Sequence, residues 1–111
     1  MDCIFCRIAK KEIPAKIVYE DKDILAFDDI KPKAKVHVVI IPKKHISSVA
    51  DLKSEDRELV AQIFMAIRKI AKGKGILETG FRTLLNYGKD AGQTIDHLHF
   101  HLLGGEKLPF A

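Results

Sequence analysis

Three histidines near the end of the chain alternate with apolar residues, in a run that reads HLHFHLLGG over residues 97–105. Successive side chains of an extended chain point to opposite faces, so His97, His99 and His101 would share one face and the apolar residues the other. Imidazole exchanges protons, attacks phosphorus or binds a metal near neutral pH. A single buried histidine is commonly a core residue with a satisfied hydrogen bond, but three in strict alternation indicate a functional role. The run therefore predicts a strand with a core on one face and a functional site on the other.

The chain has the length and composition of one small globular domain. Its 111 residues are 47% hydrophobic and 31% charged, so we expect a single domain over 1–111 with a packed core. The net charge of +4 comes from scattered lysines, which do not imply nucleic acid but would help to attract a phosphate. No apolar run approaches the roughly 20 residues of a membrane span, and Asp2, Arg7 and Lys10 stand where a signal peptide would be apolar. These features predict a cytoplasmic protein that does not enter a membrane.

Hydrophobic periodicity predicts helices over 4–8 and 54–72. In the longer one, apolar residues recur at helical spacing after the N-cap Ser54, and Gly73 and Gly75 would end it. Alternating or wholly apolar runs predict strands over 16–20, 24–28, 35–41, 81–86 and 97–103. The pattern is typical of an α+β fold, with an antiparallel sheet of about five strands, one main helix packed on it and a short N-terminal helix.

The loop before the histidine run has the composition of a phosphate-binding turn. Residues 86–94 contain two glycines, which let backbone N–H groups approach an anion, and Asn86, Gln93 and Thr94 offer neutral donors. The segment matches neither a Walker A loop nor a dinucleotide fingerprint, and such stretches are often plain turns. Its position beside the histidines favours a contact with phosphate.

Three segments of the chain resemble the histidine triad (HIT) superfamily of nucleotide hydrolases and transferases. Residues 93–103 resemble its histidine signature, residues 26–32 its nucleoside-holding segment, and residues 41–46 the segment with a fourth histidine. The likeness extends over residues 3–105, and the Leu-Gly-Gly ending and the N-terminal segment are similar to the Hint branch, the purine nucleoside phosphoramidases. The resemblance implies the HIT-like fold and a hydrolase that cleaves a P–N or P–O bond of a purine nucleotide conjugate.

The resemblance also implies a role for each residue of the site. His99, the middle histidine, would attack the α-phosphorus and form a nucleotidyl-histidine that water cleaves, while its other ring nitrogen donates to a carbonyl. His101 would steady the phosphate charge in the transition state. The nucleotide contacts would come from Asn86, Gln93 and Thr94 for the phosphate, Asp29 for the ribose hydroxyls, and Ile4, Phe5, Ile8, Phe27 and Ile30 for the base. The five apolar residues fit an ordinary core equally well.

A second site is predicted around Cys3 and Cys6. In a reducing compartment a Cys-x-x-Cys pair is more often a metal or redox site than a structural disulfide. With His45 and His97 the pair gives two sulfur and two nitrogen ligands, a set typical of structural zinc, and zinc-bearing HIT relatives resemble the chain in this. The metal would brace the strand of the nucleophile without touching phosphorus. The alternative is two free thiols packed as small apolar groups.

Two departures from the Hint pattern leave the substrate open. Thr94 stands where Hint enzymes have a serine, and threonine also occurs there in the Fhit branch of dinucleoside polyphosphate hydrolases. The chain is short after Gly105, whereas the longer Hint tail reaches the neighbouring subunit's site, so any contribution of Leu108, Pro109 and Phe110 to a partner stays open. The alternative functions are therefore an Fhit-like hydrolase or nucleotidyltransferase, and a noncatalytic zinc-binding interaction module.

The main helix also predicts a homodimer, because its apolar residues extend over more than one face and include adjacent pairs such as Met65 and Ala66. In Hint-like relatives this helix and the strand corresponding to 81–86 pair across a two-fold axis. The alternative is that Met65 and Ala66 are simply exposed.

Overall fold

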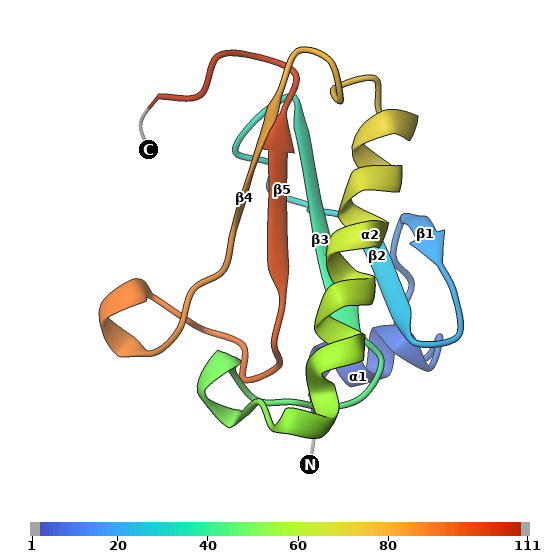
Figure 1. The fold of residues 1–111 in the computed structure, drawn as a ribbon, viewed down its shortest axis with the longest axis vertical. Coiled ribbons are helices and arrows are strands. Elements are labelled where there is room, and N and C mark those ends of the chain that lie inside the picture. The colour runs from blue at the N-terminus through green and yellow to red at the C-terminus, as the bar shows by residue number, and fades with distance from the viewer. Residues whose placement is uncertain (1–2, 110–111) are drawn as a thin grey trace.

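The computed structural model describes residues 3–109, in which five antiparallel strands form one sheet in the order β1-β2-β3-β5-β4 (Figure 1). The strands are β1 (Ile17–Glu20), β2 (Ile24–Asp28), β3 (Val36–Pro42), β4 (Phe81–Leu84) and β5 (Phe100–Gly104). The helices are α1 (Ile4–Ala9) and α2 (Arg57–Gly73), with 3-10 turns at Val49–Asp51, Ser54–Asp56 and Lys89–Ala91. The α+β class, the five-stranded antiparallel sheet, the main helix and the short N-terminal helix are as predicted.

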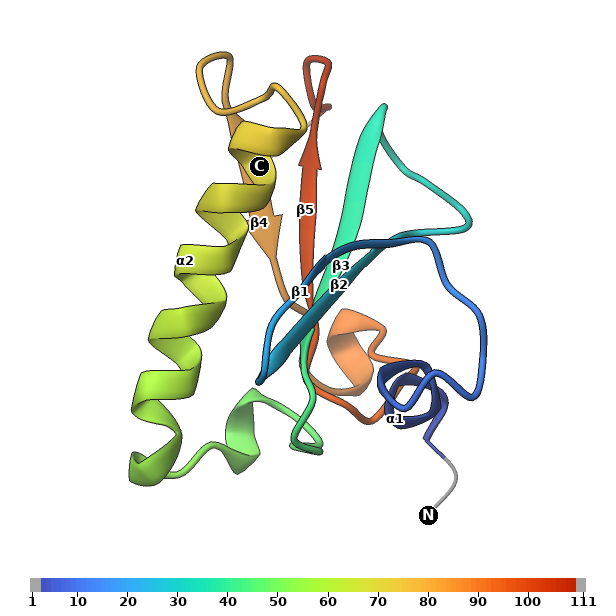
Figure 2. The same ribbon diagram turned by 90° about the vertical axis from the view of Figure 1, so that its right-hand side faces the viewer.

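Helices cover both faces of the sheet. Figure 2 shows α2 on one side of the strands and α1 on the other. The central strands β2 and β3 are buried along nearly their whole length, which explains their continuous apolar runs. The α2 side holds the larger apolar cluster, and the α1 side holds a smaller one formed by Cys3, Phe5, Ile8, Leu25, Phe27, Val39 and Ile41.

The start of α2 differs from the prediction. The helix begins at Arg57, and Ser54 is not its N-cap but opens a 3-10 turn. The reason is a contact that only the fold creates: the buried carboxylate of Asp56 accepts hydrogen bonds from the Lys53 amide and the Lys44 ammonium. These bonds hold the turn ahead of the helix.

The buried stripe of α2 repeats at helical spacing and consists of Ile63, Ala66, Ile67, Ile70 and Ala71. Of the pair predicted to be exposed or to meet a partner, Ala66 is therefore in the core and only Met65 faces outward. No helix within residues 3–109 is long and apolar enough to cross a membrane.

The histidine run is a strand only in its second half, and the prediction of a strand over 97–103 was wrong at its start. β5 begins at Phe100, where it pairs with Ile40 of β3. Two positions further along β3 stands Pro42, which has no N–H to donate to a continued ladder. His97 lies in a bend instead, with its N–H bonded to the Ile95 carbonyl at 2.9 Å.

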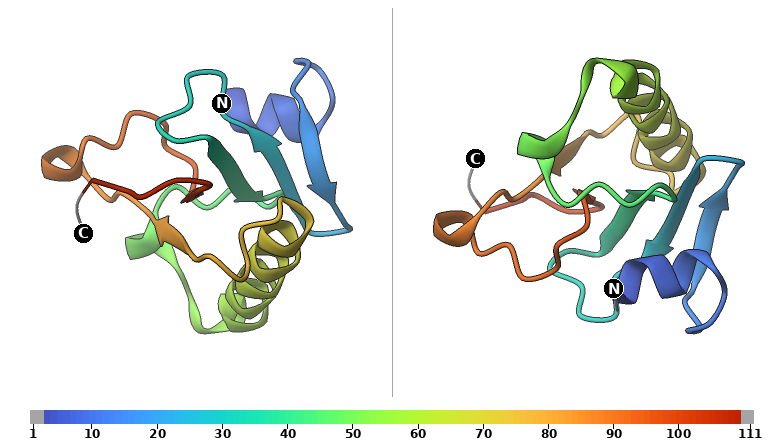
Figure 3. Two further views of the ribbon diagram at one scale, coloured as in Figure 1. Left: turned by 90° about the horizontal axis from the view of Figure 1, so that it is seen from above. Right: turned by 90° about the horizontal axis from the view of Figure 1, so that it is seen from below.

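The side chains of the run nevertheless alternate between the two faces of the sheet. Leu98, Phe100 and Leu102 belong to the α2-side cluster, which leaves the imidazoles to the α1 side. The loop between β4 and β5 also lies on the α1 side of the sheet, away from α2 (Figures 2 and 3). The fold thus gathers α1, this loop and the histidines on one face.

Candidate functional site

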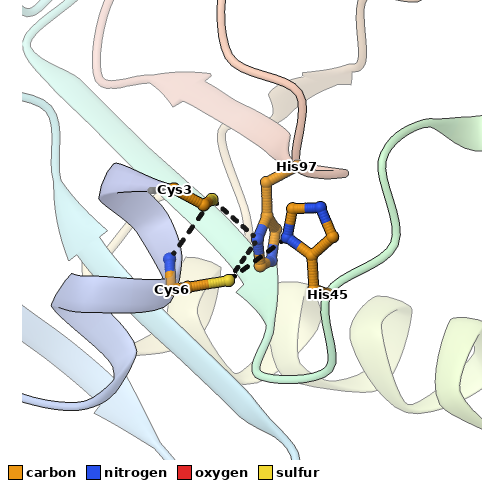
Figure 4. A group of neighbouring side chains, drawn as sticks. All are labelled: Cys3, Cys6, His45 and His97. Atoms are coloured by element: carbon orange, nitrogen blue, oxygen red, sulfur yellow. Dashed lines mark hydrogen bonds between the residues drawn. The ribbon is translucent and has the colours of Figure 1, made fainter. Parts of the chain in front are cut away.

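Two cysteines and two histidines from three parts of the chain meet at one end of β3 (Figure 4). Cys3 and Cys6 come from the start of α1, His45 follows β3, and His97 precedes β5. The Nδ1 atom of His97 lies 3.5 Å from each sulfur, and the Nδ1 atom of His45 lies 3.2 Å from the Cys6 sulfur. All four ligand atoms lie within 4.8 Å of one another. The structure therefore brings together the four residues predicted as metal ligands.

A hydrogen bond to the backbone leaves the Nδ1 lone pair of His97 directed at the two sulfurs. The Nε2 atom of His97 lies 2.8 Å from the Pro42 carbonyl, which only accepts, so Nε2 carries the proton and Nδ1 the lone pair. Ser47 Oγ stands 3.4 Å from His45 Nε2 and is the outer partner of His45, but a hydroxyl both donates and accepts and so does not by itself fix the tautomer of this ring. Outer partners of this kind are the usual companions of metal-binding histidines.

The donor set fits a tetrahedral metal better than a set of thiol hydrogen bonds. The single lone pair of His97 Nδ1 faces two sulfurs at equal distance, and it accepts a good hydrogen bond from only one. Zinc–sulfur bonds of about 2.3 Å and zinc–nitrogen bonds of about 2.0 Å give tetrahedral sulfur–nitrogen edges of about 3.5 Å. The observed separations of 3.2–3.5 Å are close to these edges.

His99 is oriented by the backbone of a residue in that cluster. Its Nδ1 atom lies 2.7 Å from the His97 carbonyl, so Nδ1 donates and the lone pair belongs to Nε2. This is the carbonyl contact expected for a nucleophilic histidine. The ring of Phe5 packs edge-on against His99, with centroids 5.1 Å apart. The same α1 that carries the two cysteines therefore also holds a ring against His99.

A second cluster consists of Asp29, His37 and His101, whose ligand atoms also lie within 4.8 Å of one another. His37 Nε2 stands 2.9 Å from His101 Nδ1 and 3.5 Å from an Asp29 carboxylate oxygen. His37 was not identified from the sequence. The available signal was a polar residue in the otherwise apolar strand β3, where it is buried.

Burial keeps the histidines of this second cluster neutral. It lowers the pKa of His101 to about 4, and the charges of His99, His37 and Lys33 act in the same direction, whereas Asp29 opposes them. Burial also lowers the pKa of His37, against the effect of Asp29. Both rings are therefore uncharged near pH 7 and act as hydrogen-bond donors and acceptors.

A hollow of about 220 Å³ opens beside His101, and it is lined by Asp29, Lys33, His37, Leu84, Asn86, His101 and Leu103. It combines a carboxylate, an amide, a cation and imidazole nitrogens with two leucines. Such a mixture suits a small polar ligand held by a few directed contacts.

Comparison with known proteins agrees with this geometry. A family model described as "scavenger mRNA decapping enzyme C-term binding" matches residues 2–108. Protein HitA of Neisseria gonorrhoeae is 46% identical over 103 residues, which are 93% of this chain and 95% of that protein. A HIT family hydrolase from Legionella pneumophila shares the fold with a TM-score of 0.96 and 47% identity, over 98% of this chain and 97% of its own. The chain belongs to the HIT family. A histidine triad nucleotide-binding protein from Candida albicans is more distant, with a TM-score of 0.84 and 33% identity over 99% of this chain and 85% of its own.

The predicted phosphate-binding residues of this HIT protein differ in whether their side chains are exposed or already engaged in hydrogen bonds. Asn86 lines the hollow, and Thr94 is exposed on the loop. The side-chain amide of Gln93 donates to the carbonyls of Ser47 and Ile95 and accepts from the Gly88 amide. Both of its N–H groups are therefore engaged in ordering the loop, and a direct bond from Gln93 to a phosphate would replace one of them.

The five residues predicted to hold the base are split between core and surface. Phe5, Ile8 and Phe27 are buried in the α1-side cluster, with the two phenylalanine rings 5.6 Å apart. Ile4 and Ile30 are exposed, Ile30 to 93%. An apolar side chain left so open beside Asp29 is available to a ligand.

Proposed function

We propose that this HIT protein hydrolyses the P–N or P–O bond at the α-phosphate of a purine nucleoside phosphoramidate or related nucleotide conjugate. The observation that carries the proposal is the bond from His99 Nδ1 to the His97 carbonyl at 2.7 Å. It leaves the Nε2 lone pair of a neutral imidazole for attack on phosphorus. Family membership supports the reaction class, since solved relatives are a hydrolase and a nucleotide-binding protein.

The reaction has two displacements. Nε2 of His99 forms a bond to the α-phosphorus, the bond from phosphorus to the leaving nitrogen or oxygen breaks, and the leaving group takes up a proton. Water then attacks the nucleotidyl-histidine, the P–N bond to His99 breaks, water's proton passes to solvent, and the nucleoside monophosphate departs. Neutral donors beside the phosphate stabilise the charge that develops on its oxygens at each step.

The residues around His99 would bind the rest of the nucleotide. His101, Asn86, Thr94 and the loop ordered by Gln93 would contact the phosphate, and Asp29 would accept the ribose hydroxyls. The apolar set Ile4, Phe5, Ile8, Phe27 and Ile30 would enclose the base, with Ile30 free to close on it.

We also propose that zinc is held by Cys3, Cys6, His45 and His97. A bound zinc supplies structural bracing there. This bracing would reach His99 through two connections. The His97 ring belongs to the cluster while its carbonyl orients His99, and α1 carries both cysteines as well as Phe5, which packs against His99. The metal site would thus hold the nucleophile in place without contacting the substrate.

The deciding experiment offers the purified protein adenosine 5′-phosphoramidate and, separately, a diadenosine polyphosphate. The proposal expects AMP from the first substrate and an adenylyl adduct on His99 in acid-quenched samples by mass spectrometry. Faster cleavage of the dinucleotide would favour the Fhit-like alternative. Zinc binding and partner binding without turnover, unchanged in His99→Gly, would instead favour the noncatalytic module.

A symmetric homodimer remains part of the proposal. Phe64 and Met65 of α2 and Phe81 of the edge strand β4 are 49%, 56% and 37% exposed, and they give this side of the molecule an apolar surface suited to its own copy. Light scattering over a range of concentrations should give about twice the chain mass of 12.5 kDa. A monomer at high micromolar concentration would refute the dimer. Of the tail residues left open for partner contacts, Leu108 and Pro109 are described and Phe110 lies outside the described residues.

A further inference from the structure

Lys33 lines the hollow beside His101 and has no carboxylate partner. Its ammonium lies 3.4 Å from the Lys31 carbonyl, which is a long hydrogen bond. Within residues 3–109 no carboxylate oxygen stands within 4.0 Å of this ammonium. By contrast, an ammonium–carboxylate distance of 2.6–3.1 Å is found for Lys11, Lys43, Lys44 and Lys74. Lys33 is therefore a cation that is free to pair with a ligand.

The backbone of Lys33 is held in place although its side chain is exposed. Its amide N–H donates to Nδ1 of the buried His37 at 3.0 Å. The next residue, Ala34, is buried, and the Asp29 amide at the start of the same loop donates to the His37 carbonyl at 3.0 Å. Because the loop is anchored at these points, the ammonium is tethered at the edge of the hollow and moves only through its own side chain.

The hollow that Lys33 lines contains one cation and one anion near pH 7. Burial keeps the rings of His37 and His101 uncharged, and the amide and leucine side chains carry no charge. The one lining carboxylate, that of Asp29, accepts a bond from the Lys31 amide at 2.8 Å and has its other oxygen 3.5 Å from His37 Nε2. Among the lining residues, Lys33 is thus the positive charge that a ligand in the hollow would meet.

The charge of Lys33 reaches the histidine proposed to contact the α-phosphate. Burial is the main reason that the pKa of His101 is low, and the charge of Lys33 lowers it further. The rings of His101 and His99 stand only 5.2 Å apart. A nucleotide with its α-phosphate between these rings would therefore bring a neighbouring group within reach of Lys33. The group that complements a free ammonium is an anion.

We propose that Lys33 is a specificity-determining residue that binds a second phosphate, so that the protein prefers nucleotides with two phosphate groups. The proposal rests on the proposed function, because it takes the α-phosphate to lie at His99 and His101. A second phosphate can belong to the leaving group, as in ADP, or to the ribose, as in adenosine 3′,5′-bisphosphate. The hollow is lined by both His101 and Asp29 and is open to either source.

The test measures the affinities of AMP, ADP and adenosine 3′,5′-bisphosphate by calorimetry. We expect one of the two diphosphorylated nucleotides to bind about tenfold more tightly than AMP, the lower end of the range for a hydrogen bond to a charged group. This preference should disappear in Lys33→Gln and persist in Lys33→Arg, which keeps the charge. The matched control is Lys31→Gln, which removes the same charge two residues away at a side chain that does not line the hollow, and it should keep the preference. Melting temperatures check that each variant is folded.

A preference for ADP would assign the second phosphate to the leaving group, and a preference for the bisphosphate would assign it to the ribose. Equal affinities for all three nucleotides overturn the proposal, as does a preference that Lys33→Gln leaves unchanged or that Lys31→Gln abolishes equally. Absence of binding by all three contradicts it as well. If the preference is found but adenosine 5′-phosphoramidate is not hydrolysed, the proposed function fails while the role of Lys33 stands. If the phosphoramidate is hydrolysed without such a preference, only the role of Lys33 fails.

Discussion

The two histidine clusters lie on the same face of the sheet and contain similar ligand atoms, yet their hydrogen bonds prepare them for different chemistry. In the Cys3, Cys6, His45 and His97 cluster, the Pro42 carbonyl accepts a hydrogen bond from His97 Nε2–H, which leaves the Nδ1 lone pair directed at the sulfurs. In the Asp29, His37 and His101 cluster, the Lys33 amide occupies the lone pair of His37 and leaves a proton between the two rings.

In both clusters the hydrogen-bond partner of the outer ring nitrogen determines whether the inner nitrogen carries a lone pair or a proton. A carbonyl outside produces a metal ligand, whereas an amide outside produces a proton donor. A metal on His37 Nε2 would need the ring proton to move to Nδ1, against the Lys33 N–H. We therefore assign metal binding to the first cluster and hydrogen bonding to the second.

The largest expected effect separates catalysis from the metal. His99→Gly should lower turnover of adenosine phosphoramidate by about 10³-fold or more, because the nucleophile contributes to the transition state rather than to ground-state binding. Zinc content, the melting temperature and AMP affinity should stay nearly unchanged. Residual turnover within tenfold of the unmodified protein would contradict the assignment of His99.

The second effect separates the clusters by metal content. Cys6→Ser should lose the bound zinc and lower the melting temperature by about 10 °C or more, because a closed metal site adds directly to folding free energy. The matched control, Asp29→Asn in the other cluster, should keep about one zinc per chain by elemental analysis. Equal zinc content in both variants would remove the distinction.

The third effect is a pH dependence of stability that belongs to the second cluster. The folded pKa of His101 is about 4, below its ordinary value of 6.5, so between these values the unfolded chain binds more protons and stability falls as pH falls. Above pH 6.5 both states are neutral and this contribution is absent. The melting temperature measured from pH 7.5 to 4.5 should drop by about 5 °C more in the unmodified protein than in His101→Gln. Parallel curves would show that His101 is not held neutral by burial.

The smallest effect tests the link between the clusters. Gln93 joins Ser47, whose hydroxyl lies 3.4 Å from His45 of the first cluster, to Gly88 in the loop near the hollow. Gln93→Glu loses both donated bonds, each worth about 1 kcal/mol or less at a half-exposed site. We expect KM to rise about threefold with kcat and zinc content unchanged, measured beside Gln93→Asn as a shorter amide control. A fall in kcat without a change in KM would place Gln93 in the chemistry instead.

The parts of the molecule that could be predicted are those that follow from the local spacing of apolar residues. Helix α2 and strands β2 and β3 follow from spacing and continuous apolar runs, since both faces of the sheet are covered. The four metal-ligand candidates could be named because thiols and imidazoles are few and chemically distinctive. The structure places them together, as predicted.

The parts that could not be predicted depend on contacts between distant segments. His37 in a buried strand is indistinguishable by pattern from an ordinary core histidine until His101 is placed beside it. The halt of β5 at Phe100 depends on which residue of β3 faces it, and the late start of α2 depends on Lys44 reaching Asp56. Composition likewise does not reveal that the Gln93 amide is already engaged.

The most direct test of the central claim, that one cluster binds a metal and the other holds a proton, is zinc-edge X-ray absorption of the protein with and without AMP. We expect two sulfur ligands at about 2.3 Å and two nitrogen ligands at about 2.0 Å, unchanged when AMP binds. A sulfur-free shell of nitrogen and oxygen, or a shell that changes with AMP, would place the metal at Asp29, His37 and His101 and contradict it.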